Sequence, residues 1–240
     1  MNNKTTVFLA IILASASLCT AETIILDAVD TGSYDERGYC LLNDDSSTGI
    51  THLGARYRSN NSFFVFSIPE FDTDIQDVTL SLELTMYASN DAFEDICISA
   101  VSTPIDQLII SHSYSVEVGM APEIYSDLMD GPELGVMQVN VGTLFPFVFL
   151  PSFWEHGPVF SCILNQTAVQ MIQDVEGGTF AVGMSLVNTR GDEDEWVDFN
   201  SSFIHPDFQI QQLQITLIPE PATLLLVSIG AFLLRSGKRK

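Results

Sequence analysis

One ten-residue stretch of the chain, 78–87, alternates almost perfectly between apolar and polar side chains. A period of two over this length predicts a half-buried antiparallel strand. The apolar set is Val78, Leu80, Leu82, Leu84 and Met86. The same pattern predicts strands at 23–29, 62–68, 95–101, 180–187 and 208–217, with shorter ones near 136–141, 145–150 and 159–163. In 208–217 the alternation slips at Gln211-Gln212, which predicts a β-bulge.

Helical signals are few. Asn165 is a good N-cap residue for a helix that ends at Gly177-Gly178. Thr103-Pro104-Ile105-Asp106 matches a capping box and predicts a short helix through Ile110. Many short strands with one or two small helices, and no internal repeat or linker, predict an all-β, two-sheet antiparallel β-sandwich as one domain over 22–217.

The beginning of the chain has the features of a secretory signal peptide over 1–21. Lys4 supplies a positive start, 7–13 is apolar, and small residues lead to Ala21, after which we expect cleavage. Cleavage after Ala16 is an alternative. A lipoprotein signal cut before Cys19 is a third interpretation, disfavoured by Leu18 at a position where such signals have a small residue. A buried N-terminal helix is the non-secretory alternative.

The end of the chain, 218–240, predicts a membrane segment. Residues 222–234 carry no charge, and the stretch from Ile218 to Leu234 is at the lower limit for a helix that spans a bilayer. A basic cluster after it should stay cytoplasmic, which places the bulk of the chain outside. The cluster consists of Arg235, Lys238, Arg239 and Lys240. A core helix is the alternative, disfavoured because the basic cluster follows at once.

Pro219-Glu220-Pro221, the apolar stretch and the basic end together resemble the PEP-CTERM sorting signal of exported bacterial proteins. The resemblance covers about a tenth of the chain and is specific because all parts occur in order. It implies transit through the inner membrane, recognition by an exosortase, cleavage near 219–221, and display at the cell surface or in the extracellular matrix. Such proteins occur in bacteria that make extracellular polysaccharide.

A second resemblance covers much of the body. The segments 63–69 and 75–82 are similar to the openings of jelly-roll modules in surface and carbohydrate-associated proteins. Segments 124–128 and 164–168 resemble recurring segments of PEP-CTERM proteins. The resemblance implies a jelly-roll-like sandwich and contact with glycans, but it transfers no binding residues.

Composition and charge exclude several classes. The 240 residues are 46% hydrophobic, 10% aromatic and 17% charged, too apolar for a disordered protein. The formal charge is −22, which excludes nucleic acid as a partner because phosphate binding needs clustered Lys and Arg. Residues 22–220 contain all 31 acids, four arginines and no lysine, and so carry a formal −27. Self-repulsion at this density predicts saline or divalent-rich surroundings.

Three cysteines remain after signal removal. The oxidising compartment allows one disulfide, which we assign to Cys40–Cys162, with Cys97 as a small buried hydrophobe in a strand. No Cys-x-x-Cys spacing points to zinc.

Candidate site chemistry is sparse, and no catalytic residues are assigned because no HExxH, GxSxG, P-loop or GxGxxG motif occurs. The segment 191–198 is rich in carboxylates, and Asp192, Asp194 and Asp198 are candidate Ca²⁺ ligands, although a solvated loop is the favoured interpretation. Trp196 and Trp154 are candidate sugar-stacking residues.

These observations predict an exported, surface-displayed, non-catalytic protein of the extracellular matrix, with polysaccharide or cations as expected ligands. Ca²⁺ is the one cofactor considered. A secreted glycan hydrolase with paired carboxylates is the first alternative. A structural envelope protein without ligand is the second.

Overall fold

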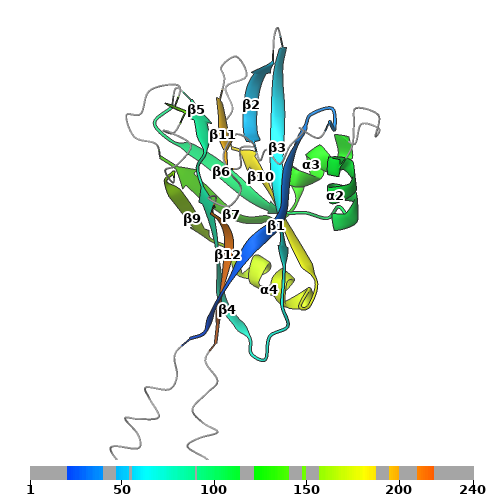
Figure 1. The fold of residues 1–240 in the computed structure, drawn as a ribbon, viewed down its shortest axis with the longest axis vertical. Coiled ribbons are helices and arrows are strands. Elements are labelled where there is room, and N and C mark those ends of the chain that lie inside the picture. The colour runs from blue at the N-terminus through cyan, green and yellow to red at the C-terminus, as the bar shows by residue number, and fades with distance from the viewer. Residues whose placement is uncertain are drawn as a thin grey trace, which may run out of the picture.

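The computed structural model describes most of the body of the chain. Its residues form one twelve-stranded antiparallel sheet, curled into a nearly closed barrel, with three short helices (Figure 1). The described residues are 21–39, 47–53, 56–89, 91–113, 122–140, 148–149, 157–187, 195–199 and 210–218. The predicted antiparallel, mostly β architecture is confirmed at this level.

The strands are β1 (Thr23–Asp35), β2 (Ser47–Leu53), β3 (Arg56–Ser67), β4 (Ile75–Glu83), β5 (Met86–Ala88), β6 (Glu94–Ala100), β7 (Glu133–Val139), β8 (Val148–Phe149), β9 (Val159–Ile163), β10 (Thr179–Leu186), β11 (Glu195–Asp198) and β12 (Gln211–Leu217). The helices are α2 (Ile105–Ser113), α3 (Pro122–Asp130) and α4 (Gln166–Asp174).

β1 joins two halves of the sheet. Its first residues pair with β12, and β4 and β9 follow to complete the half that we call sheet A. A bulge between Ala28 and Asp30 lets the rest of β1 pair with β3, which leads through β10 and β6 to β7 in sheet B. The other part of β3 pairs with β2. The strands β11, β5 and β8 follow β2 in that order and extend sheet B. A bulge bends a strand, which explains how β1 serves both halves.

The barrel closes at a seam between β7 and β9, whose described residues form no strand ladder with each other. Three hydrogen bonds bridge the seam. The Asn165 N–H donates to the Leu134 carbonyl at 2.8 Å, the Asn165 side-chain amide donates to the Glu133 carbonyl at 2.7 Å, and the Cys162 thiol donates to the Val136 carbonyl at 3.3 Å. Gly135 allows this approach, because a Cβ at that position would lie 2.9 Å from Cys162 Sγ.

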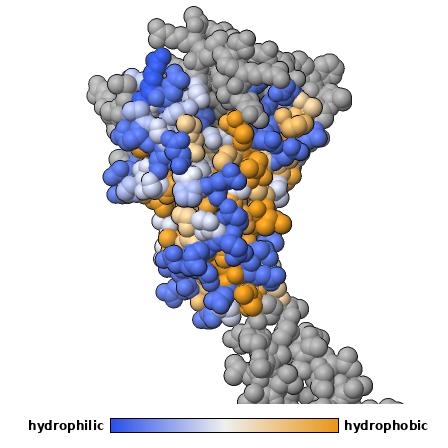
Figure 2. Space-filling view, turned by 180° about the vertical axis from the view of Figure 1, so that it is seen from behind, coloured by the Kyte–Doolittle hydropathy of each residue, from blue (hydrophilic) through white to orange (hydrophobic). Residues whose placement is uncertain are grey.

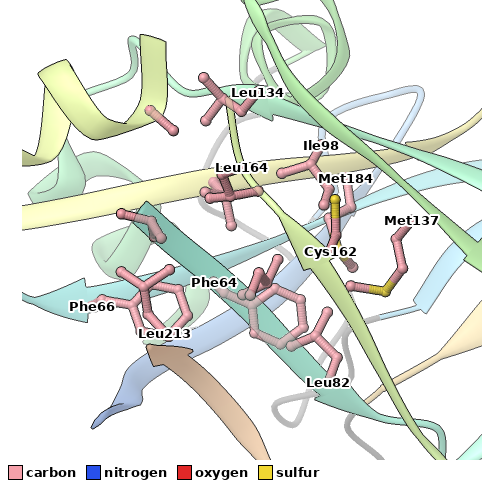
Figure 3. Packing of buried hydrophobic residues seen from close by; sticks show 14 of the residues in the cluster. Phe64, Phe66, Leu82, Ile98, Leu134, Met137, Cys162, Leu164, Met184 and Leu213 are labelled. Carbon is pink, nitrogen blue, oxygen red and sulfur yellow. The ribbon is translucent and has the colours of Figure 1, made fainter. Parts of the chain in front are cut away.

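The inward faces of both sheets form the main core. Phe64 and Phe66 of β3 meet Leu82 of β4 and Leu213 of β12, while Met137 reaches in from β7 (Figure 3). Strict alternation in β4 and β12 sends every second side chain to this interior. Burial of such residues is the dominant stabilising term for a sheet protein.

A second apolar cluster lies on the outside of sheet B, under α2 and α3. Tyr34, Phe63 and Val65 project outward from the sheet and pack against Leu108 and Leu128 of the helices. The Tyr34 hydroxyl donates to the Leu108 carbonyl at 3.0 Å, which satisfies the polar end of a fully buried ring. At Gly183 the backbone of α3 comes so close that a Cβ would lie 2.3 Å from the Leu128 carbonyl oxygen.

A single carboxylate fastens α3 to the connection between β6 and α2. Asp127 accepts hydrogen bonds from the backbone N–H and the hydroxyl of both Ser102 and Thr103, at 2.5–2.9 Å. Burial by itself raises the pKa of Asp127, but the hydrogen bonds from Ser102 and Thr103 outweigh it and hold the pKa below its ordinary value. α2 begins at Ile105, and the hydrogen bonds of Thr103 go to Asp127 rather than to Asp106, so the predicted capping box is not formed.

The other helix predictions are closer to the structure. α4 begins after Asn165, whose side chain accepts from the N–H groups of Thr167 and Ala168 as predicted for an N-cap. Pro104 lies just before α2, and its carbonyl accepts from Gln107 and Leu108. α3 is a helix that the sequence analysis did not predict.

Two strand predictions need correction. The predicted strand 78–87 breaks at Leu84-Thr85, because those N–H groups bond to Pro158 and Asp198 instead. Pairing of β12 with β4 runs without a shift from Gln211 to Thr216, so the predicted bulge at Gln211-Gln212 is wrong and the irregularity lies at Thr216/Leu217.

The cysteines also differ from prediction. Cys162 is a free thiol, so the predicted Cys40–Cys162 disulfide is not formed, and Cys40 lies outside the described residues. Cys97 is half-buried rather than buried, because it projects to the outer side of β6. Burial raises the pKa of both thiols, which keeps them protonated and poorly reactive at neutral pH.

Candidate functional site

The two predicted address segments adjoin the folded body at one end. Residues 1–20 and 219–240, with Pro219, Glu220, Pro221 and the basic cluster, lie outside the described residues. Their points of attachment lie side by side, at the lower end of the body in Figure 1. The Leu217 N–H donates to the Glu22 carbonyl, and the Ile218 N–H donates to the Asp74 carbonyl, both at 2.8 Å. The body is therefore hydrogen-bonded up to the residue before Pro219.

Two of the predicted ligand-binding residues lie on β11. Asp198 is buried, with 2% of its surface exposed, and its carbonyl accepts from the N–H and hydroxyl of Thr85 at 2.8 Å. Trp196 is half-buried between β5 and β2. Trp154, Asp192 and Asp194 lie outside the described residues, so a Ca²⁺ site in 191–198 and sugar stacking by Trp196 and Trp154 stay predictions.

The structure brings together a group of polar side chains that the sequence analysis did not connect. Glu94 begins β6, Glu195 begins β11, and both are buried, with 3% and 0% of their surface exposed. Ser89 follows β5 and its hydroxyl donates to the Glu94 carboxylate. The Asp91 N–H donates to Ser89 Oγ at 2.9 Å, and the Tyr87 hydroxyl donates to the Asp91 carbonyl at 3.2 Å.

Burial raises the pKa of Glu94 above its ordinary value, and the negative charges of Glu195, Asp91 and Asp95 add to the effect against the opposing Ser89 hydrogen bond. Burial also raises the pKa of Tyr87. A carboxyl with a raised folded-state pKa favours folding at low pH. Its contribution is lost as pH rises from the ordinary pKa through the raised one.

Two neighbouring carboxyls, one with a raised pKa, are also the requirement of a glycoside hydrolase. However, Glu94 and Glu195 are both almost fully buried, and a glycosidic bond must lie between the two catalytic groups. We therefore assign no catalytic role to the pair and regard it as part of the packing between β5, β6 and β11.

One sequence signal could have found this group. Glu94 is in phase with Ile96 and Ile98, the buried positions of β6, so its carboxylate points to the side that the strand buries. The contact with β11 has no such signal, because β11 is four residues long and follows an acidic segment.

Metal-binding and membrane-spanning features can be judged only for the described part of the chain. There, no group of three or more His, Cys, Asp or Glu side chains is arranged to hold a metal ion. Across the same residues, no helix combines the length and the apolar character needed to cross a membrane.

Comparison with known proteins gives no family for this chain: no protein-family model matches it, and no curated protein is significantly similar in sequence.

Proposed function

We propose that the protein is exported, displayed at the cell surface, and serves there as a non-catalytic component of the extracellular matrix. In this proposal a jelly-roll-like body lies between an N-terminal signal peptide and a C-terminal sorting signal, whose apolar helix holds the chain in the inner membrane until an exosortase acts on it.

The observation that carries the proposal is the pairing of the two ends of the body. Thr23 is opposite Thr216 in the β1–β12 ladder, and the last described residue, Ile218, is still hydrogen-bonded to Asp74. Segments 1–21 and 219–240 can therefore be removed without breaking any hydrogen bond within the described body. Such a body is compatible with address segments that are cut off in transit.

Acidic charge supports placement in a matrix and agrees with either expected ligand. With four arginines and no lysine against 31 acids in 22–220, the body repels other anionic surfaces and attracts cations. Polysaccharide is the other proposed ligand, with Trp196 and Trp154 as the candidate contacts. Both ligands rest on the sequence alone.

The test follows the full chain in a bacterium that has an exosortase and in the same strain without it. We expect the body in the extracellular fraction of the first strain, with its C-terminus trimmed near 219–221 by mass spectrometry. In the second strain we expect the untrimmed chain in the inner membrane. Replacing Pro219 and Pro221 by alanine should have the same effect as removing the exosortase.

The chain offers a matched control, because Pro132-Glu133 repeats the Pro-Glu pair at an exposed position where β7 begins. Pro132→Ala with Glu133→Ala should leave export and trimming unchanged. Extracellular, trimmed protein in the strain without exosortase would contradict the proposed sorting route, and retention of the whole chain in the cytoplasm would contradict export itself.

A further inference from the structure

The outer face of sheet A is not covered by any helix of the described residues; its outward side chains are exposed on β1 and β9 and half-buried on β12 and β4. Its residues alternate with the buried ones of β1, β12, β4 and β9, so that Ile25 projects outward where Ile24 and Leu26 project inward. The face consists of Thr23, Ile25, Asp27 and Val29 on β1, Gln212, Gln214 and Thr216 on β12, Asp77, Thr79 and Ser81 on β4, and Val159, Ser161 and Ile163 on β9.

This face carries a formal charge of −2 over its thirteen residues, so it is acidic like the rest of the body. Asp27 and Asp77 are its only charged residues. Glu83, the next outward position of β4, is 4% exposed, and its carboxylate accepts from the N–H groups of Gly157 and Ile210 at 2.6 and 3.0 Å. Two copies that meet at this face therefore bring four carboxylates together, and their repulsion must be screened by salt.

Exposed aliphatic side chains collect on the same face. Of the nine large hydrophobics that are exposed in the described residues, Ile25, Val29, Val159 and Ile163 belong to it, with 58%, 60%, 44% and 73% of their surface exposed. Seen from behind, the body carries hydrophobic residues between hydrophilic ones (Figure 2). These four aliphatic side chains lie on β1 and β9, the outer two strands of the face, with the polar side chains of β12 and β4 between them.

Strand register arranges these side chains in rows across the sheet. One row reads Ile25, Gln214, Thr79, Ile163, and the next reads Asp27, Gln212, Ser81, Ser161. Hydrogen bonds within the second row join Gln212 Nε2 to Asp27 Oδ1, and the hydroxyls of Ser81 and Ser161, each at 2.9 Å. In the first row the aliphatic residues are at the two ends and the polar residues in the middle. The row therefore has the same order of aliphatic and polar residues whether it is followed from β1 or from β9.

We propose that two copies of the protein associate face to face through the outer face of sheet A, around a two-fold axis that runs along the strands. Such an axis places β1 of one copy over β9 of the other and β12 over β4, at the same level. Ile25 then meets the copy's Ile163, and Val29, two outward positions further along β1, meets Val159.

The polar positions also match under this axis. Asp27 faces Ser161, Gln214 faces Thr79, and Asp77 faces Thr216, so every acid meets a hydroxyl. An axis across the strands places each strand over its own copy. If this axis is placed so that Ile25 of one copy meets Val29 of the other, it passes through the level of Asp27. Asp27 of one copy would then face Asp27 of the other. Like charges directly opposed are unfavourable, so the axis along the strands is preferred.

The dimer is weak and depends on salt. Four strands of about five residues, about 4.8 Å apart, cover roughly 250–300 Å², against about 800 Å² per partner in a standard stable interface. Because both copies carry strong negative charge, added salt screens their repulsion and strengthens association. We expect dimers at high protein concentration and high ionic strength.

The test is sedimentation velocity of the full chain at low and high salt. Ile25→Asp alone and Ile163→Lys alone should each weaken dimerisation about tenfold or more, a difference of about 1.4 kcal/mol or more. Combining the two substitutions should restore it, because the carboxylate introduced at position 25 then meets the ammonium introduced at position 163 of the copy. Within one chain the same two positions are three strands apart. The matched control Val136→Lys adds the same charge to the exposed part of β7 and should change nothing.

Three results would overturn the proposal. Dimerisation that is unchanged in both single variants would place the interface elsewhere. A double variant no better than the singles would reject the axis along the strands. Loss of retention on an immobilised neutral glucan in the single variants, with sedimentation unchanged, would assign this face to polysaccharide instead.

Discussion

The two sheets carry opposite kinds of outer face. Outside sheet B, Tyr34, Phe63 and Val65 are fully buried because α2 and α3 cover them. Outside sheet A, Ile25 and Ile163 are more than half exposed, and glutamine, threonine and serine fill the space between them. β1 contributes side chains to both outer faces. Whether helices cover a face therefore depends on the side chains of that face, not on which strand carries them.

The largest expected difference comes from truncating one apolar residue on each face. Phe63→Ala should lower the free energy of unfolding by about 3–5 kcal/mol, because it leaves a cavity between β3 and the helices. Ile163→Ala on the outer face of sheet A should cost less than about 0.5 kcal/mol, because the side chain is 73% exposed. Urea unfolding of dilute protein measures both. Equal losses of unfolding free energy in the two variants would mean that the outer faces of sheet A and sheet B are both covered.

Gly183→Ala tests how closely α3 is seated on sheet B. The added methyl group would lie 2.3 Å from the Leu128 carbonyl oxygen, a backbone atom that cannot rotate away. We expect a loss of about 1–3 kcal/mol from overpacking, with weaker protection of α3 in hydrogen exchange. Gly178→Ala, at a turn away from α3, is the comparison for hydrogen exchange, since it should leave α3 protection unchanged. An unaltered stability of the Gly183 variant would contradict the close approach.

Asp127→Asn tests whether charge-assisted hydrogen bonds attach α3. The substitution should lower the free energy of unfolding by about 1–2 kcal/mol at neutral pH, a modest loss because the carboxylate is partly exposed. The folded-state pKa of Asp127 is lowered, so its stabilisation is complete above the ordinary aspartate pKa and is lost as pH falls through the lowered value. The difference between wild type and variant should therefore shrink in acid.

A urea-unfolding series from neutral to acidic pH checks this prediction. Asp130→Asn, on the exposed side of the same helix, is the control and should have little effect at any pH. A difference for Asp127→Asn that does not change with pH would show that the carboxylate charge is unimportant.

Sequence patterns predicted those strands in which large apolar residues alternate with small or polar ones along the chain. β4 and β10 were found because one face is apolar throughout, and α4 because its cap and apolar spacing agree. β3 extends six residues before the predicted start at 62, because the buried side chains of its early part include Asn60 and Asn61. Burial of amides there depends on partners such as the Tyr125 carbonyl, which accepts from Asn61 Nδ2 at 3.1 Å.

Missed elements had weaker or misleading signals. α3 starts with Pro122 and buries Ile124 and Leu128, a spacing that fits a helix but spans only one turn. The buried group of Glu94, Glu195 and Ser89 could not be predicted as a whole, because three short segments meet there through non-local pairing. The rows of the outer face of sheet A likewise require strand register, which a single sequence does not give.

The position of β12 has a consequence for the synthesis of the protein. The last strand to leave the ribosome lies between β1, the first, and β4, and it pairs with both along most of its length. A chain cut short before Gln211 would leave two exposed strand edges that invite aggregation. A prematurely terminated product therefore exposes the edges of β1 and β4 that β12 covers in the folded protein.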